Sequence, residues 1–459
     1  MSRESQGFDA LVERERGLKQ SLSTGQLSMI AIGGAIGTGL FLGSAFAIGF
    51  AGPSVMISYA IGAVISLLLM GCLAEMAVGH PTPGAFGAYA EYYISPLAGF
   101  LVRYAYWSSI VLAIGTEISA VALYMQYWFP TLPGWYWIVG FSVGLIGINA
   151  VHVNMFGAVE YVFSMFKILA IVGFLLLGAY FVAGAPAASG VGFANYTAHG
   201  GFFPKGLWGM WVAVIVAIFS YLSIEMIAVA AGEARDPQRA ITRAFKATVF
   251  RLVFFYLLTL ALILAIIPWN AAGTAGSPFV KVMAATHIPG ATGLVNLVVL
   301  VAALSAMNSQ LYITTRMMFS LSRGGYASRK LGEVNARGVP LRALLLSCIG
   351  IAVAAVANAA LPDSSFIVMV AISMFGALFT WLMIFVTHLC FRRRHPAPTG
   401  FRMWGYPYTS AAGAVSVLAV LATTAFTEEF RMTLIYGAPF LVVLTIAYHA
   451  WYRRRPVAA

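Results

Sequence analysis

The chain has 459 residues, of which 61% are hydrophobic and only 9% are charged. A soluble chain of this length would form about three domains with about 25% charged residues. The composition therefore indicates an integral membrane protein and excludes soluble, disordered, collagen-like and disulfide-rich classes. The net charge of +12 does not indicate nucleic-acid binding, because the basic residues lie in short segments between apolar runs.

Apolar runs long enough to cross a bilayer recur along the whole chain. A helix needs about 20 residues to span roughly 30 Å of hydrocarbon. The sequence predicts twelve such helices, near residues 27–49, 53–78, 97–128, 134–152, 157–184, 206–231, 240–268, 289–322, 341–361, 364–391, 408–427 and 433–452.

The basic residues are distributed unevenly between the two sides of these spans. Only Lys205, Lys281 and Arg431 lie in connections that follow odd-numbered spans, and Lys167 lies inside a span. The other Lys and Arg residues gather on the opposite side, which the positive-inside rule assigns to the cytoplasm. We therefore expect a multi-pass protein of the cell membrane, inner or plasma, with both termini in the cytoplasm.

Two predicted spans contain an interruption at similar depth, Gly33–Gly39 in the first and Phe219–Glu225 in the sixth. Five helices separate their starts, a spacing typical of transporters built from two inverted halves. The sequence accordingly predicts five regions. They are an N-terminal cytoplasmic tail (1–26), a first repeat with helices 1 to 5 (27–190), an extracellular loop (191–205), a second repeat with helices 6 to 10 (206–392), and helices 11 and 12 with a C-terminal cytoplasmic tail (393–459).

The glycines of the first span predict a site for an anion. A helix broken inside the bilayer exposes N–H and C=O groups that lipid cannot satisfy, at several kcal/mol each. An amino acid zwitterion fits, because its carboxylate accepts from a half-helix N-terminus and its ammonium donates to free carbonyls. We assign Gly37, Thr38 and Gly39 to the carboxylate. Close helix packing is the alternative, since Gly33 and Gly37 form a small-xxx-small pattern.

Three ionisable residues, Glu117, Lys167 and Glu225, lie well inside predicted spans. Each costs about 2.5–3.5 kcal/mol at mid-bilayer on insertion scales, which makes each a functional candidate. Burial destabilises an ammonium, so Lys167 would suit proton transfer; a fixed cation holding spans 1 and 8 together is the alternative. Glu225 either joins substrate binding, proton handling or a pair with Lys167, or only caps the second half-helix of span 6.

Glu117 shares one stripe of the third span with Ile110, Ala113 and Ile114. This stripe either lines a pocket, to which we assign Ile110 and Ile114, or is ordinary packing.

The eighth span is unusually polar for a helix that faces lipid. Its polar side chains either lie against span 1 and Lys167 or hydrogen-bond across helices as structural contacts. They are Ser305, Asn308, Ser309, Gln310 and Tyr312. Three further carboxylates lie near cytoplasmic span ends, where we expect capping or pairing with arginines. They are Glu75, Glu160 and Glu233.

Several strings occur in the order and spacing of a known family. They are Gly33–Phe41, Gly52–Ser54, Pro83-Gly84 with Tyr89, Ala231–Ala234 with Asp236-Pro237, Ser277–Phe279, and Ala303–Ser309 with Arg316. With these strings, over roughly residues 18–400, the chain resembles the amino acid transporter family of the amino acid, polyamine and organocation superfamily.

The resemblance implies an all-helical membrane fold of five-plus-five inverted repeats, with discontinuous helices 1 and 6 and two appended helices. It implies proton-coupled import of amino acids by alternating access, and we expect neutral amino acids. The substrate carboxylate would bind Gly37, Thr38 and Gly39, and its amine would bind carbonyls of Phe219, Ser220 and Leu222. The residues that match the family's coupling positions are Lys167, Glu225 and Glu117.

The chain departs from the family at Leu222-Ser223, where relatives usually carry glycine. The size and polarity of the pocket therefore change, and the sequence does not identify which amino acid is the substrate.

Expected partners are a small amino acid, protons and the lipid bilayer, without nucleic acid, for a monomer or homodimer. The seven His residues are dispersed and no enzyme, metal or nucleotide motif occurs, so we expect no cofactor and no enzymatic activity. An exchanger of amino acids or amines and a non-transporting amino acid sensor are the alternatives.

Overall fold

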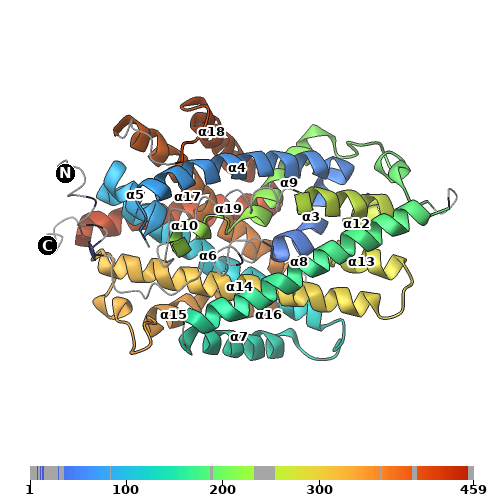
Figure 1. The fold of residues 1–459 in the computed structure, drawn as a ribbon, viewed down its shortest axis with the longest axis horizontal. Helices are drawn as coiled ribbons and strands as arrows, with labels where there is room; N and C mark the ends of the chain where they lie inside the picture. The colour runs from blue at the N-terminus through green and yellow to red at the C-terminus, as the bar shows by residue number, and fades with distance from the viewer. Residues whose placement is uncertain are drawn as a thin grey trace.

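The computed structural model describes residues 36–82, 84–151, 153–186, 190–231, 254–361, 364–394 and 401–452, together with residues 8, 11, 13, 14 and 29. Every regular element in these ranges is a helix (Figure 1). The expectation of an all-helical membrane protein is confirmed, because ten helices of the described part are long and apolar enough to cross a bilayer.

The count of twelve spans and the inverted repeat stay predictions. One of the ten stretches, Gly39–Gly79, covers the second part of predicted span 1 and all of span 2. The shorter apolar helix Phe254–Ile266 is the described end of the span predicted at 240–268. Gly33–Ala35, Pro83, Asp236-Pro237 and both predicted tails, apart from a few N-terminal residues, lie outside the described residues.

The main helices follow the predicted spans to within a few residues, except that the sixth and ninth spans are each formed by two consecutive helices. They are α4 (Val55–Gly79), α6 (Pro96–Met125), α7 (Gly134–Val151), α8 (Val153–Gly184), α9 (Gly206–Tyr221), α14 (Ala291–Arg323), α15 (Leu341–Ser347), α16 (Ile349–Ala360), α17 (Ser365–Arg394), α18 (Tyr408–Thr423) and α19 (Arg431–Ala447). The shorter elements that matter below are η1 (Gly39–Gly43), α3 (Ser44–Ala51), α5 (Ala85–Tyr93), α10 (Met226–Ala231), α12 (Trp269–Ala272) and α13 (Pro278–Ala285).

Local sequence explains the sharp start of α6, the central helix. The Ser95 hydroxyl accepts from the backbone N–H of Ala98 at 3.1 Å, and Pro96 occupies the first helical position. A serine cap followed by proline satisfies one free N–H and removes another, which fixes where a helix begins.

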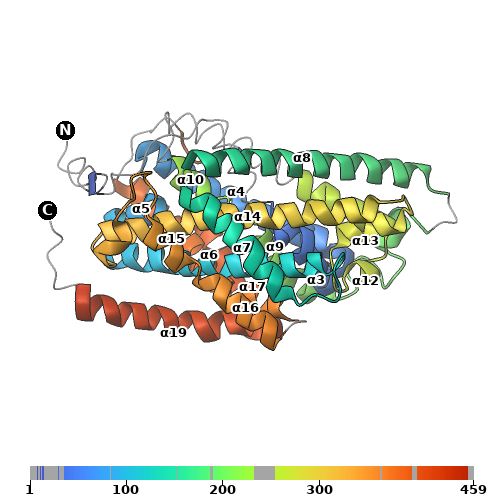
Figure 2. The same cartoon turned by 90° about the horizontal axis from the view of Figure 1, so that it is seen from below.

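The middle of the bundle is formed by α6, which packs along both α14 and α17. Figure 2 shows α8 and α19 at opposite faces of the molecule. The most apolar part of Gly206–Val229 is entirely buried, whereas only 22% of the corresponding part of Glu428–Trp451 is buried. The span with a predicted interruption therefore lies in the core, and the last helix lies at the surface of the bundle.

Residues near the two ends of the chain meet at one end of the bundle. Arg14 forms an ion pair with Glu91 of α5 at 3.0 Å, and Tyr326 donates to the same carboxylate at 3.2 Å. The Tyr326 ring lies 6.3 Å from the ring of Tyr448. Arg14 and Tyr448 therefore lie at the same end of the bundle, and the side of the membrane that this end faces stays a prediction.

The expected pairing of Glu75 with an arginine is confirmed. Its carboxylate lies 2.6 Å from Arg392 Nε and accepts from the backbone N–H of Met403 at 2.7 Å. His388 Nε2 lies 3.1 Å from the same carboxylate. This cluster joins α4 to α17 and to the segment before α18, so Glu75 is structural. Glu233 lies outside the described residues.

Candidate functional site

The predicted interruption of span 6 is confirmed. The helix α9 ends at Tyr221, residues 222–225 form a turn, and α10 begins at Met226. Leu222 is extended, with φ −58° and ψ 157°, and Ser223 has a φ of +75°. A non-glycine residue with this positive φ costs about 1–2 kcal/mol. The break therefore forms without glycine, at the cost of backbone strain at Ser223.

We expect Ser223→Gly to raise the midpoint of thermal unfolding of the purified protein without ligand. Glycine takes a positive φ freely, and its larger freedom in the unfolded chain offsets part of the gain, which leaves about 0.5–1 kcal/mol. Ser142→Gly, inside α7, is the matched control and should lower the midpoint. A lower midpoint for Ser223→Gly would show that the turn is held by contacts of the serine side chain.

The chain resumes as a helix at the predicted place in span 1. Ile36 and Gly37 form a bend, and the helical residues begin at Thr38 and continue through η1 into α3. The backbone N–H of Thr38 donates to the Glu117 carboxylate of α6 at 3.2 Å. The N-terminus of this half-helix thus already holds a carboxyl group, and the helix dipole and the free N–H groups favour its ionised form.

The two interruptions touch each other through Gly39. A Cβ atom on Gly39 would lie 2.6 Å from the Cα atom of Ser220, and one on Gly37 would lie 2.8 Å from the Ala306 Cβ and 2.9 Å from Glu117 Oε1. Close packing therefore explains why glycine stands at 37 and 39. The bond between Thr38 and Glu117 places a carboxyl group at the same half-helix N-terminus, and binding of a substrate carboxylate there stays a prediction.

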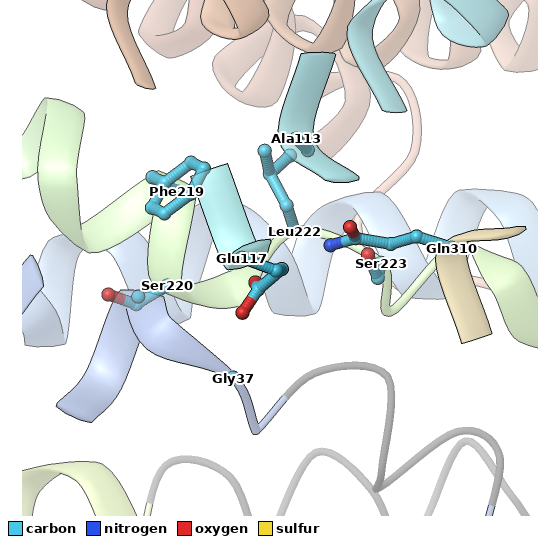
Figure 3. A pocket seen from close by; sticks show the side chains of 9 residues that line it. Gly37, Ala113, Glu117, Phe219, Ser220, Leu222, Ser223 and Gln310 are labelled. Carbon is cyan, nitrogen blue, oxygen red and sulfur yellow. The ribbon is translucent and has the colours of Figure 1, made fainter. Parts of the chain in front are cut away.

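A small pocket lies where the two interruptions meet α6 and α14 (Figure 3). Its lining residues are Gly37, Gly39, Ala113, Glu117, Phe219, Ser220, Leu222, Ser223 and Gln310. The open space is about 10 Å³, which is about one water molecule. The pocket is therefore closed around its own side chains, and a larger ligand enters only when some of them move.

Most of the predicted site residues converge here. Thr38 contributes its backbone N–H without lining the pocket. Ile110 and Ile114 are completely buried in α6 and do not line it; Ala113, from the same stripe, does. Ser223 and Gln310 join the site, and the signal for Gln310 was the polarity of span 8.

The carbonyl groups at the end of α9 already have donors. The Phe219 carbonyl accepts from the backbone N–H of Leu222 at 3.2 Å, and the Ser220 carbonyl accepts from the Tyr256 hydroxyl at 2.9 Å. A carbonyl oxygen has two lone pairs, so each still has room for a second donor. Tyr256 had no sequence signal, because an aromatic residue in an apolar span is usually a packing residue.

Lys167 lies beside the bend of span 1 without reaching the pocket. It is completely buried, and its Nζ donates to the Ile36 carbonyl at 2.9 Å. Glu160 and Glu117 are the carboxylates that interact with its charge. Lys167 therefore binds the start of the half-helix and lies within range of the charges of two acidic groups, one of which is bonded to Thr38.

Glu225 contacts other groups than Lys167. Its carboxylate accepts from the Tyr106 hydroxyl at 2.9 Å and from the backbone N–H of Ser223 at 3.2 Å. The structure therefore supports a carboxylate that caps the turn in span 6, and it does not support the pair with Lys167.

The expectation that Glu160 pairs with an arginine at a span end is wrong. Glu160 is completely buried in α8 and accepts from Ser305 at 2.6 Å and from Asn308 at 3.1 Å, both on α14. The physical reason is helix rotation: residues 160, 164 and 167 share one face of α8, and this face lies against α14. Ser305 and Asn308, two of the polar residues of span 8, thus bind Glu160 on α8.

Comparison with known proteins fits this arrangement. The family described as "Amino acid permease" matches residues 26–458. The chain is 35% identical to a gamma-aminobutyric acid permease of Bacillus subtilis over 448 residues, 96% of each chain. It is 33% identical to a probable threonine/serine transporter of the same organism, over 95% of each chain. It is also 35% identical to a putative histidine permease, over 94% of this chain and 93% of the other.

Proposed function

Because the chain belongs to the amino acid permease family, we propose that it imports neutral amino acids together with protons, by alternating access. Membership of the family makes it an amino acid transport protein of the membrane, and its relatives are named as permeases or transporters rather than enzymes. The coupling to protons, the direction and the neutral substrate are the proposal. It also places both chain ends in the cytoplasm and divides the core into two inverted repeats.

The observation that carries the proposal is the carboxylate of Glu117 on the backbone N–H of Thr38. A substrate carboxylate would take the same half-helix N-terminus, at Gly37, Thr38 and Gly39. The substrate amine would then face the carbonyls of Phe219, Ser220 and Leu222 across the pocket, which is lined by both interruptions (Figure 3). A zwitterion is the ligand that satisfies both sets of groups.

Competition for one N–H group supplies the coupling to protons. Two carboxylates at the Thr38 N–H repel each other, so an incoming substrate carboxylate favours a proton on Glu117. Lys167 donates to the Ile36 carbonyl and interacts with the charge of Glu117. It would then exchange a proton with Glu117. Glu225 would keep the turn of span 6 in place. Substrate and proton would therefore be bound, and released, together.

Transport by reconstituted protein tests this proposal. With an inward gradient of one pH unit, liposomes should accumulate a radiolabelled neutral amino acid about tenfold, since one proton carried down this gradient supplies about 1.4 kcal/mol. A protonophore should abolish the accumulation. Equal accumulation after collapse of the gradient would contradict proton coupling, and flux that needs internal amino acid would identify an exchanger. Binding without any flux would identify a sensor.

A further inference from the structure

One polar group of the pocket is not used by the proposed binding of the zwitterion. Gln310 extends from α14 into the pocket and is 4% exposed. Its Oε1 atom has no hydrogen-bond partner among the described residues. A buried acceptor that lacks a donor is unfavourable, so this oxygen requires water or a ligand.

The neighbouring carboxylate fixes which end of the Gln310 amide faces the pocket. Gln310 and Glu117 line the same pocket, and a carboxyl group keeps an acceptor oxygen whether or not it carries a proton, so the amide nitrogen faces Glu117. Figure 3 shows the end of the Gln310 side chain pointing toward Glu117, with its nitrogen on that side. The oxygen is therefore left as an acceptor for whatever occupies the pocket.

Space in the pocket limits what can donate to this oxygen. The open space of about 10 Å³ accommodates roughly one water molecule. A substrate side chain that enters would displace this water. A hydroxyl or amide side chain replaces the lost donor, whereas an aliphatic side chain of the same size leaves the Gln310 oxygen without one.

We propose that Gln310 is a specificity-determining residue that selects amino acids with a hydrogen-bond donor in a small, uncharged side chain. The inference rests on the proposed function, because it assigns the side-chain subsite of the same pocket. Ser223, the other new polar residue of the lining, carries a hydroxyl that both donates and accepts, so it discriminates less. Gln310 rejects aliphatic side chains because its oxygen can only accept.

Threonine and valine test the inference, since they have nearly the same shape and differ by a hydroxyl in place of a methyl group. The measurement is the concentration of each that halves uptake of a radiolabelled amino acid by proteoliposomes. Wild-type protein should bind threonine at least about tenfold more tightly than valine. Gln310→Met keeps the length of the side chain and removes the acceptor, so the ratio should fall to within about twofold.

A second variant and a control make the test specific. Gln310→Leu should give the same loss of preference as Gln310→Met and replaces it if that variant does not fold. The control is Ser309→Ala, which alters the residue before Gln310 on α14. Ser309 is buried and outside the pocket lining, so this variant should keep the wild-type preference for threonine over valine.

The outcomes separate the inference from the proposed function. Uptake with a wild-type ratio near one, or an unchanged ratio in the folded Gln310 variants, would overturn the role of Gln310 and leave amino acid transport intact. Failure of all twenty amino acids to be taken up or to raise the melting temperature of wild-type protein would overturn both.

Discussion

Lys167→Gln is expected to abolish accumulation against a gradient while sparing part of the exchange of substrate. The Lys167 ammonium donates to the Ile36 carbonyl and interacts with two carboxylates, Glu160 and Glu117. Glutamine keeps a donor but carries neither a charge nor a transferable proton. Hydrogen bonds from charged groups contribute about 1.5–3 kcal/mol, so the rate of proton-driven uptake should fall by about 10- to 100-fold, too slow for accumulation.

Two assays on the same proteoliposomes measure this effect. Accumulation is followed under an inward proton gradient, and exchange is followed as counterflow without one. Lys205→Gln removes an exposed lysine at the start of α9 and should leave both rates unchanged. Wild-type accumulation in Lys167→Gln would make Lys167 a packing residue. Loss of both rates in a folded variant would make it a fixed cation that holds the bend of span 1.

Sequence alone predicted the features that depend on composition along the chain. The apolar runs place the long helices within a few residues, because a span must bury about 20 residues in hydrocarbon. The turn at residues 222–225 was predicted from the correspondence of spans 1 and 6, since paired interruptions have a known role in transporters. The ionisable residues Glu117 and Lys167 were identified because charge inside a bilayer is costly and rarely accidental.

Features that depend on helix rotation were harder to predict. On α6, the stripe was identified correctly, but Ala113 and Glu117 face the pocket. Ile114 is rotated about the helix axis by about 100° from Ala113 and by about 60° from Glu117. Ile110 lies two turns, about 10 Å along the axis, from Glu117. A residue pattern gives the face of a helix, and only the packed neighbour decides which part of that face meets a ligand.

Long-range partners were missed for a related reason. Glu160 was expected at a span end because distance from the loop was the only guide, whereas α14 provides its donors, Ser305 and Asn308. Tyr256 reaches the Ser220 carbonyl from a segment 36 residues away in the chain. Neither contact follows from spacing within one helix. The spacing of residues 160, 164 and 167 was a usable signal, because it places polar groups on one face of an apolar span.

Gly39→Ala is expected to weaken substrate binding by more than about 100-fold. The added Cβ would lie 2.6 Å from the Cα and 3.1 Å from the backbone nitrogen of Ser220. These are backbone atoms of the opposite interruption, so no side chain can move aside, and the two half-helices must separate. Overpacking of this kind costs about 1–3 kcal/mol or more in stability. Binding should suffer further because the carboxylate and amine sites would move apart.

Alanine substitutions at two other glycines should weaken substrate binding less than Gly39→Ala does. At Gly37 an added Cβ meets the Ala306 Cβ and Glu117 Oε1, at 2.8 Å and 2.9 Å. The glutamate side chain can turn away, so Gly37→Ala should weaken binding less than Gly39→Ala. At Gly144 in α7 nothing lies within 4 Å, so Gly144→Ala should keep wild-type affinity and gain about 0.5–1 kcal/mol of stability.

Affinity and stability must be measured separately, because close packing and ligand binding both require glycine at this contact. Ligand binding by purified protein gives the first, and thermal unfolding without ligand gives the second. If Gly39→Ala unfolds at a lower temperature but binds amino acids as the wild type does, the glycine serves packing alone. If affinity falls far more in Gly39→Ala than in Gly37→Ala, and both variants are folded, the ligand must contact both interruptions. Only a ligand that contacts both loses affinity when the two half-helices separate.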